Sequence, residues 1–275
     1  MKKRSWQIEP QQPPRTLQEY LADHLGISRN QAKALIDRRG VFINKRRVWM
    51  ARHRVKPGDV IELTESAPVP DKLPPILHRE SGLLILDKPP GVTTNGPHSL
   101  ETILRQLLNR PRLEALHRLD RDTSGCVMFC DDRDLAATII ALFAARRVTK
   151  IYQAIVIGRP EFEQREMDTP LDGQPARTRL RVLDRSRLAA HLQISIDTGR
   201  THQIRRHLMQ LRLPLLGDRH YTAGRTLDKA QMHVPRQMLH ARRLLLPHPA
   251  GHATLKVQAP LPQDFLSALR AMGLR

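Results

Sequence analysis

The sequence contains no apolar run near the length of a membrane span. A transmembrane helix needs about 18 or more consecutive apolar residues, and no stretch of this chain approaches that length. No signal-peptide pattern follows the opening Met1-Lys2-Lys3-Arg4. We therefore expect a cytoplasmic protein that does not associate with membranes.

Cysteine is almost absent, and the two cysteines that occur are Cys126 and Cys130. In a strand, residues four apart face the same side but lie about 13 Å apart, which is too far for a disulfide. Two thiols do not form a zinc site without further Cys or His ligands at suitable spacing. We expect buried, reduced thiols, and we assign no metal because the 13 histidines are scattered.

Acidic residues are outnumbered by basic ones. The chain has 27 Asp and Glu against 46 Lys and Arg, which gives a net charge of +19. Such a surplus favours a polyanionic partner, because Lys and Arg displace counterions that are condensed on phosphates. An ordinary basic protein remains the alternative on charge alone.

The length of 275 residues exceeds the roughly 100–200 that are typical of one domain. Residues 1–14 are polar and proline-rich, so we expect a flexible arm there. Residues 66–75 include four prolines and are typical of a semi-rigid linker. We therefore expect a small domain over residues 15–65 and a large domain over residues 76–275.

The small domain begins with two helix-start signals. Thr16 with Glu19, and Ser28 with Gln31, have the spacing of capping boxes. Apolar residues follow each box at helical spacing, and short strand-like runs come after the second helix. We expect two small helices followed by short strands.

This segment resembles the alpha-L RNA-binding domain first described in a ribosomal small-subunit protein. The resemblance rests on residues 28–32, 35–36, 41–44 and 55–59. In that family the second helix and the following turn present cations to structured RNA. A solvated basic face is the alternative for any single cation, but the cluster favours phosphate binding. The candidates are Arg29, Lys33, Arg38, Arg39, Lys45, Arg46 and Arg47.

The large domain alternates strand-like and helical segments irregularly. Strand-like runs lie at residues 83–86, 127–129, 152–157, 178–182, 189–196 and 253–257, and helical patterns at 99–108 and 132–147. This pattern predicts an α+β fold with a mixed, mostly antiparallel sheet, flanking helices and a central cleft.

The densest group of polar residues is the run 117–125, His-Arg-Leu-Asp-Arg-Asp-Thr-Ser-Gly. It lies between a predicted helix and a predicted strand, and loops between rigid elements often carry functional residues. A solvated turn would explain Asp-Thr-Ser-Gly alone, but not the His-Arg pair that precedes it. Both a functional loop and a plain turn remain open.

A second polar cluster covers residues 198–207, where Gly199 ends a strand and a helix follows. Cations at a helix start oppose the helix dipole. Arg200, Arg205 and Arg206 therefore predict an acid or a phosphate nearby. A basic helix that only binds phosphate remains the alternative.

Residues 118–125 and 198–205 resemble the two defining motifs of the RluA family of pseudouridine synthases. The resemblance covers residues 76–275, and an alpha-L domain is a common partner in that family. Further family motifs occur in the expected order, at residues 86–91, 150–154, 214–218 and 239–241.

The resemblance implies an isomerase that converts uridine into pseudouridine in structured RNA. The reaction breaks the bond from N1 to C1′ and joins C5 to C1′, and it needs no cofactor, metal or redox change. It needs a carboxylate near C1′ or C2′ that acts as nucleophile or base. By the family's pattern this group is Asp120, and Asp122 is interpreted as structural.

The resemblance also assigns partners to Asp120. Arg205 matches the arginine that pairs with the catalytic Asp and keeps it ionised. Tyr152 matches the catalytic tyrosine that stacks on the base and takes part in the late deprotonation at C5, although a Tyr in an apolar strand is most often core. Arg118 matches the residue that fills the space left by the extruded uridine. The remaining substrate-binding candidates are Ile204, His117, Arg200 and His202.

Large-subunit ribosomal RNA is the favoured substrate and transfer RNA is the alternative, and we expect a monomer. A catalytically inactive RNA chaperone and a nucleoside hydrolase are the rival hypotheses. Intact Asp120, Tyr152 and Arg205 argue against the first, and the lack of a metal-binding Asp cluster or a paired acid argues against the second. Arg212 departs from the family's usual glycine, which leaves the local turn uncertain.

Overall fold

The computed structural model describes residues 3–10, 13, 15–37, 41–44, 46–48, 50–64, 73–80, 82–221, 234–249, 251 and 253–275. Contacts divide the chain into two compact units, Met1–Asp71 and Lys72–Arg275. Within these described ranges, no helix has both the length and the apolar character needed to cross a membrane.

The first unit contains the two helices that the capping boxes predict. α1 (Leu17–Leu25) begins at Thr16, whose hydroxyl accepts the backbone N–H of Glu19 while the Glu19 carboxylate accepts that of Thr16. α2 (Arg29–Asp37) begins with the same reciprocal pair between Ser28 and Gln31. The strands are β1 (Lys3–Gln7), β2 (Arg15–Thr16), β3 (Val41–Ile43), β4 (Arg46–Arg47), β5 (Arg54–Val55) and β6 (Val60–Thr64), with β1-β6-β3-β4 in one sheet and β2-β5 in another.

The expectation of a flexible arm over residues 1–14 is wrong for residues 3–7. These residues form β1, which pairs antiparallel with β6 along its whole length. Trp6 packs against the core of this unit, and Ile8 is buried in it. The polar composition obscured a period-two pattern in which Trp6 and Ile8 point inward.

The second unit contains a mixed sheet in which, among the described residues, ten strands take part. The order is β12-β13-β14-β11-β15-β10-β8-β7, with β9 beside β10 and β16 beside β15. Only the β10–β15 pair among these is parallel. The α+β prediction is therefore confirmed. The strands are β7 (Ile76–Glu80), β8 (Leu83–Lys88), β9 (Glu114–Ala115), β10 (Ser124–Cys130), β11 (Thr149–Ile157), β12 (Gln164–Met167), β13 (Thr178–Arg185), β14 (Ala189–Ile196), β15 (Leu239–Pro247) and β16 (Thr254–Gln258).

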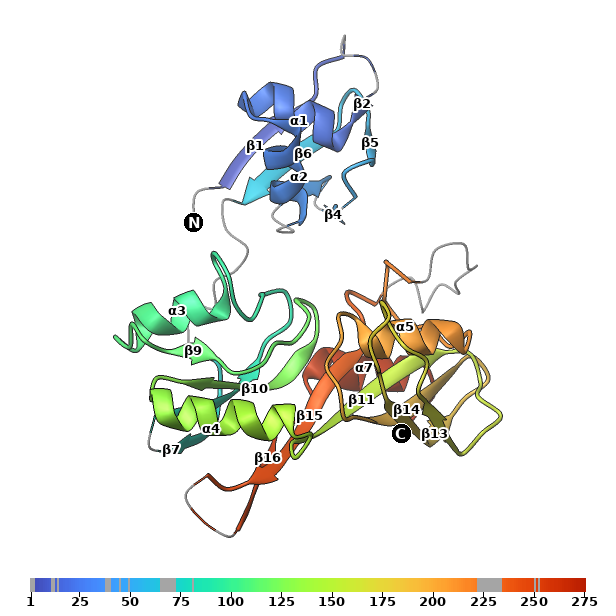
Figure 1. Ribbon diagram of the computed structural model, residues 1–275. Helices are drawn as coiled ribbons and strands as arrows, with labels where there is room; N and C mark the ends of the chain where they lie inside the picture. Colours follow the sequence, from blue (N-terminus) through green and yellow to red (C-terminus); the bar gives the residue numbers. More distant parts are fainter. Residues whose placement is uncertain are drawn as a thin grey trace. The chain divides into compact units, whose positions relative to one another are not determined.

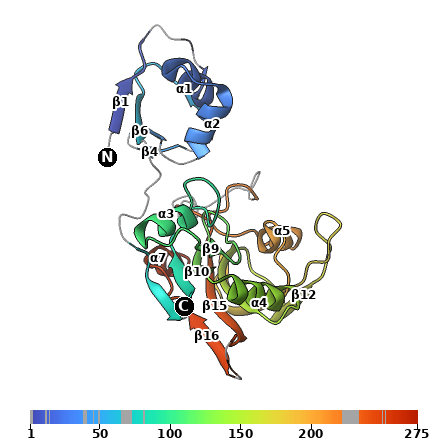
Figure 2. The same ribbon diagram turned by 60° about the vertical axis from the view of Figure 1, so that its left-hand side comes forward.

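Helices cover both faces of this sheet (Figure 1). α3 (Leu100–Leu107) and α5 (Gln203–Gln210) share one apolar cluster with alternate residues of β8, β10 and β11. α4 (Arg133–Ala144) and α7 (Gln263–Ala271) pack on the intervening residues, which face the other side. Figure 2 shows the β15–β16 hairpin projecting from the end of the sheet.

The parallel β10–β15 pair joins the two halves of the sheet at Gly125. Gly125 has φ of 111° and lies opposite Ala241. A Cβ at Gly125 would lie 2.2 Å from the Ala241 carbonyl oxygen. Neither the backbone conformation nor the space admits a side chain, so glycine is required at this position.

We predict that Gly125→Ala destabilises the large unit by about 3 kcal/mol or more, because it adds a backbone clash to an unfavourable φ. Gly173→Ala is the matched control, since Gly173 has φ of 72° but no heavy atom within 4 Å of an added Cβ. The control should lose only about 1 kcal/mol. Urea denaturation followed by circular dichroism measures both; equal losses would contradict the close approach.

A buried histidine at the same join makes stability depend on pH. His240 lies with Nδ1 2.9 Å from the Ser124 hydroxyl, and burial lowers its pKa to about 4. In the unfolded chain His titrates near pH 6.5, so as pH falls below that value the unfolded state takes up the proton first. The protonation of His240 therefore leaves the free energy of unfolding unchanged above pH 6.5 and lowers it as the pH falls from 6.5 towards 4.

We predict that the free energy of unfolding falls between pH 7.5 and pH 5, and that His240→Gln makes this fall smaller. Urea titrations at several pH values provide the slope for each protein. The slope, and not the absolute stability, is the readout, because the substitution itself changes packing. An identical slope in the variant would show that His240 does not remain neutral in the folded state.

Candidate active site

The loop from 116 to 123, which leads into β10, is fixed by buried side chains. Lys88 is fully buried, and its Nζ donates to the carbonyls of Pro89, Val92 and Arg121 at 2.9, 2.8 and 3.0 Å. Burial lowers the pKa of Lys88 to about 7. These bonds fix the loop's backbone, so the direction of its side chains is set by the fold.

Hydrogen bonds also fix this loop next to Asp120 and at its end. The Thr94 hydroxyl donates to the Leu119 carbonyl at 3.1 Å and accepts its N–H at 3.0 Å. Arg236, paired with Asp264, donates to the Asp122 carbonyl at 3.0 Å. The backbone is thus held by hydrogen bonds on both sides of Asp120, at Leu119 and at Asp122.

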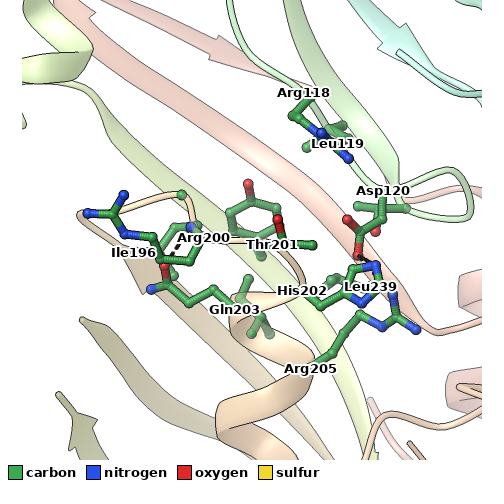
Figure 3. A pocket seen from close by; sticks show the side chains of 14 residues that line it. Arg118, Leu119, Asp120, Ile196, Arg200, Thr201, His202, Gln203, Arg205 and Leu239 are labelled. Carbon is green, nitrogen blue, oxygen red and sulfur yellow. Dashed lines mark hydrogen bonds and ion pairs between the residues drawn. The ribbon is translucent and has the colours of Figure 1, made fainter. Parts of the chain in front are cut away.

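Arg205 joins this loop to α5. Its Nη1 donates to Asp120 Oδ2 at 3.1 Å, although the two residues are 85 positions apart in the chain. Its Nε and Nη2 donate to the two oxygens of Asp218 at 2.6 and 3.0 Å. The side-chain exposure rises from 1% at Asp218 through 8% at Arg205 to 22% at Asp120. Asp120 is therefore the accessible end of a chain of charges, and Figure 3 shows Arg205 beside it at the pocket.

Asp218, the last residue of the motif at 214–218, is a further residue of the site that the sequence alone does not predict. It also accepts the backbone N–H groups of His220 and Tyr221 at 3.0 and 3.3 Å. The preceding Gly217 has φ of 76° and no room for a Cβ, since the Arg236 carbonyl lies 2.0 Å from where it would be. The signal in the sequence was the Gly217-Asp218 pair. An acid in a tight turn that becomes buried needs a cationic partner, which here is Arg205.

Asp120 lines a pocket whose walls come from both functional clusters. Tyr152 of β11 is 6% exposed and Ile204 of α5 is 4% exposed. Burial raises the pKa of Tyr152 further above its usual range, with the charge of Asp120 acting in the same direction. Tyr152 is therefore a neutral phenol at physiological pH. The lining residues are Arg118, Leu119, Asp120, Thr123, Tyr152, Ile196, 199–205 and Leu239.

The turn into α5 carries His202 and Arg200 into the same pocket. Gln203 shapes this turn: its Oε1 accepts from the Thr198 hydroxyl at 2.8 Å and from the Arg200 N–H at 3.1 Å. His202 has φ of 53°, and its Nε2 lies 3.9 Å from Asp120 Oδ2. Burial lowers the pKa of His202, while the carboxylate of Asp120 opposes that shift. The sequence predicted an acid or a phosphate near the arginines of this helix, and acids are present: Arg205 pairs with Asp218 and Asp120, and Arg206 pairs with Asp172.

His117, predicted from the sequence to bind substrate, lies outside the Asp120 pocket. Its Nε2 accepts the backbone N–H of Met128 at 3.1 Å, and its ring packs 5.3 Å from that of Phe143. Burial lowers the pKa of His117 to about 3, so the ring is neutral. It lines a neighbouring hollow and not the Asp120 pocket. A sequence cannot distinguish a loop residue that faces a pocket from one that faces the strand behind it.

The other candidates lie as follows. Arg118 is exposed at the pocket mouth, whereas Arg29 and Lys33 are exposed on α2 of the first unit. β4 contains Arg46 and Arg47. Arg38, Arg39 and Lys45 lie outside the described residues.

No group of three His, Cys, Asp or Glu in the described part of the chain could hold a metal ion. Cys126 and Cys130 are free and buried in β10.

Arg212 stands where the family usually has glycine, and it keeps the left-handed conformation that glycine favours, with φ of 57°, in the turn after α5. An Arg in that conformation costs about 1–2 kcal/mol relative to glycine.

The buried pair predicts a large effect at Asp218. Asp218→Asn should destabilise the large unit by about 3–5 kcal/mol, because Arg205 loses the charge that compensates its burial. Asp172→Asn, which breaks an exposed pair with Arg206 of α5, should cost far less, because water screens that pair. Urea denaturation of both variants tests this ranking; equal costs would mean that the buried pair is not structural.

Two family models match the chain. One described as RNA pseudouridylate synthase matches residues 82–210, and one described as S4 domain matches residues 15–61. The S4 match confirms the resemblance of the first unit to a ribosomal small-subunit RNA-binding domain. The solved structure of human RNA pseudouridylate synthase domain containing 4 matches with a TM-score of 0.64 and 26% identity, over 73% of this chain and 94% of that one.

Curated relatives extend the match. Ribosomal large subunit pseudouridine synthase D of Pseudomonas aeruginosa is 35% identical over 221 residues, which cover 70% of this chain and 69% of that protein. Ribosomal large subunit pseudouridine synthase C of Vibrio cholerae is 34% identical over 268 residues, which cover 84% of each. The chain therefore belongs to the RNA pseudouridylate synthase family, whose members are isomerases that act on RNA.

Proposed function

We propose that this protein converts uridine into pseudouridine in large-subunit ribosomal RNA, with Asp120 as the catalytic group. The observation that carries the proposal is a carboxylate in an open pocket, fixed by an arginine 3.1 Å away that a buried second carboxylate positions. The names of the relatives from P. aeruginosa and V. cholerae support ribosomal RNA over transfer RNA.

The chemistry needs one well-placed carboxylate. The bond from N1 to C1′ breaks, the uracil turns, C5 bonds to C1′, and the proton on C5 is finally lost while N1 gains one. Asp120 acts as nucleophile at C1′ or as base at C2′. Arg205 gives the carboxylate one orientation and favours its ionised form.

The pocket supports roles for its other walls. Tyr152 stacks on the extruded base, and Ile204 provides an apolar surface beside it. Because Tyr152 is a neutral phenol, it positions the base and donates or relays a proton more readily than it removes one as phenolate. Arg118 is exposed at the mouth and is suited to fill the space that the flipped uridine leaves.

His202 and Arg200 border the same pocket and are proposed to contact the ribose or its phosphates. The N-terminal S4 domain is proposed to recruit the RNA through Arg29, Lys33 and the further cations predicted from the sequence. The enzyme is proposed to act as a monomer. A ribosomal RNA substrate supports a cytoplasmic site of action.

We predict that Asp120→Asn lowers the rate of tritium release from [5-³H]uridine-labelled large-subunit ribosomal RNA by at least about 10⁴-fold. The substitution keeps the shape of the side chain but removes its charge. Asp122→Asn, in the same loop, is the matched control and should retain a rate of the same order as the unaltered protein. Binding of RNA by both variants should stay close to normal.

Four results would contradict the proposal. Full activity of Asp120→Asn would assign the chemistry to another group. Release of free uracil would indicate a hydrolase. Binding of ribosomal and transfer RNA without any tritium release would indicate a non-catalytic RNA-binding protein, and release from transfer RNA alone would change the substrate.

A further inference from the structure

A second hollow lies beside the Asp120 pocket. The two share a wall, because Arg118, Tyr152, Ile196, Gly199 and Arg200 line both. The second hollow extends from this wall to the end of α4 and the start of β11. It does not include Asp120, and the cations Arg146 and Lys150 that line it have no role in the chemistry proposed above.

Four cations line this second hollow, namely Arg118, Arg146, Lys150 and Arg200. The one acid that lines it, Asp197, already accepts two hydrogen bonds from Arg179, at 2.9 Å each. The hollow therefore presents a net positive charge that its own acid does not neutralise.

The lining arginines differ from the other arginines of this unit. Arg110, Arg206 and Arg236 each pair with an aspartate through two hydrogen bonds. Within the described part of the chain, Arg118 and Arg146 have no carboxylate partner, and the guanidinium of Arg200 donates only to the Pro175 carbonyl. Three unneutralised guanidinium groups around one hollow favour a bound anion.

Lys150 lines the hollow and is only 9% exposed. Its Nζ donates one hydrogen bond within the described residues, to the Thr198 carbonyl at 3.1 Å. An ammonium has three N–H donors, so two make no hydrogen bond among these residues, although the ammonium also lies 5.7 Å from the centroid of the Phe143 ring. Lys150 is thus a buried cation whose hydrogen-bonding capacity is incompletely used.

Arg146 occupies a position that favours glycine. It follows α4 with φ of 57°, and its N–H bonds to the Phe143 carbonyl in the turn that ends the helix. Glycine would adopt this conformation without strain, whereas arginine does not. Arg146 lies at the end of α4 and lines the hollow.

We propose that this hollow binds a backbone phosphate of the nucleotide next to the target uridine. Lys150 and Arg146 contact the phosphate, and Arg200 lies between it and the flipped base. Because the hollow and the Asp120 pocket share Tyr152, a phosphate bound here sets the register of the strand and places one particular uridine over Asp120. This inference rests on the proposed function, since it takes the ligand to be the RNA substrate.

The test compares Arg146→Ala with Arg147→Ala, each introduced into the full chain with Asp120→Asn so that no turnover occurs. Arg147 is the next residue along, is also exposed, and does not line the hollow. The probe is an unmodified transcript of large-subunit ribosomal RNA, titrated at several salt concentrations. Arg146→Ala should weaken binding by about tenfold and reduce the slope of log K against log salt by about 0.7–0.9. Arg147→Ala should change neither.

A second variant separates binding from folding. Arg146→Gly should raise the melting temperature by about 2–4 °C, because it relieves the left-handed strain, and should still weaken RNA binding like Arg146→Ala. Equal effects of Arg146→Ala and Arg147→Ala would overturn the inference in favour of a diffuse basic face. Tritium release by the unaltered protein is measured separately, so a failure of the proposed function is recognised independently.

Discussion

The structure of the site depends on one guanidinium group. Arg205 forms two hydrogen bonds with the buried Asp218 and one with the accessible Asp120. Burying an arginine without a carboxylate would cost several kcal/mol, and the charge of Asp218 offsets this cost for Arg205. Both Asp218 oxygens accept from Arg205, and one of the other N–H groups of Arg205 donates to Asp120 and fixes its carboxylate at the pocket.

The fold brings this chain of charges together from distant segments. Asp120 belongs to the loop before β10, and Arg205 to the first turn of α5. The loop is rigid because Lys88, Thr94 and Arg236 donate hydrogen bonds to its backbone. The parallel contact of β10 with β15 at Gly125 sets where the loop ends, so a single glycine connects the packing of the sheet to the geometry of the site.

Local signals predicted much of the fold, and non-local pairing accounts for what they missed. The capping boxes at Thr16 and Ser28 satisfy backbone groups within four residues, so the sequence suffices to locate both helix starts. β1 was missed because its partner is β6, more than fifty residues away. Asp218 was missed for the same reason, since its role exists only where Arg205 reaches it. The direction in which His117 faces is likewise decided by β10 and not by its neighbours in sequence.

The central claim is that the carboxylate fixed by Arg205 isomerises uridine in ribosomal RNA. The most direct measurement is carbodiimide-stop sequencing of ribosomal RNA from a strain that lacks this protein, complemented either with the unaltered gene or with Asp120→Asn. The account predicts that one or more large-subunit pseudouridines disappear in the strain and return only with the unaltered gene. Unchanged pseudouridines in the deletion strain, or their return with Asp120→Asn, would contradict it.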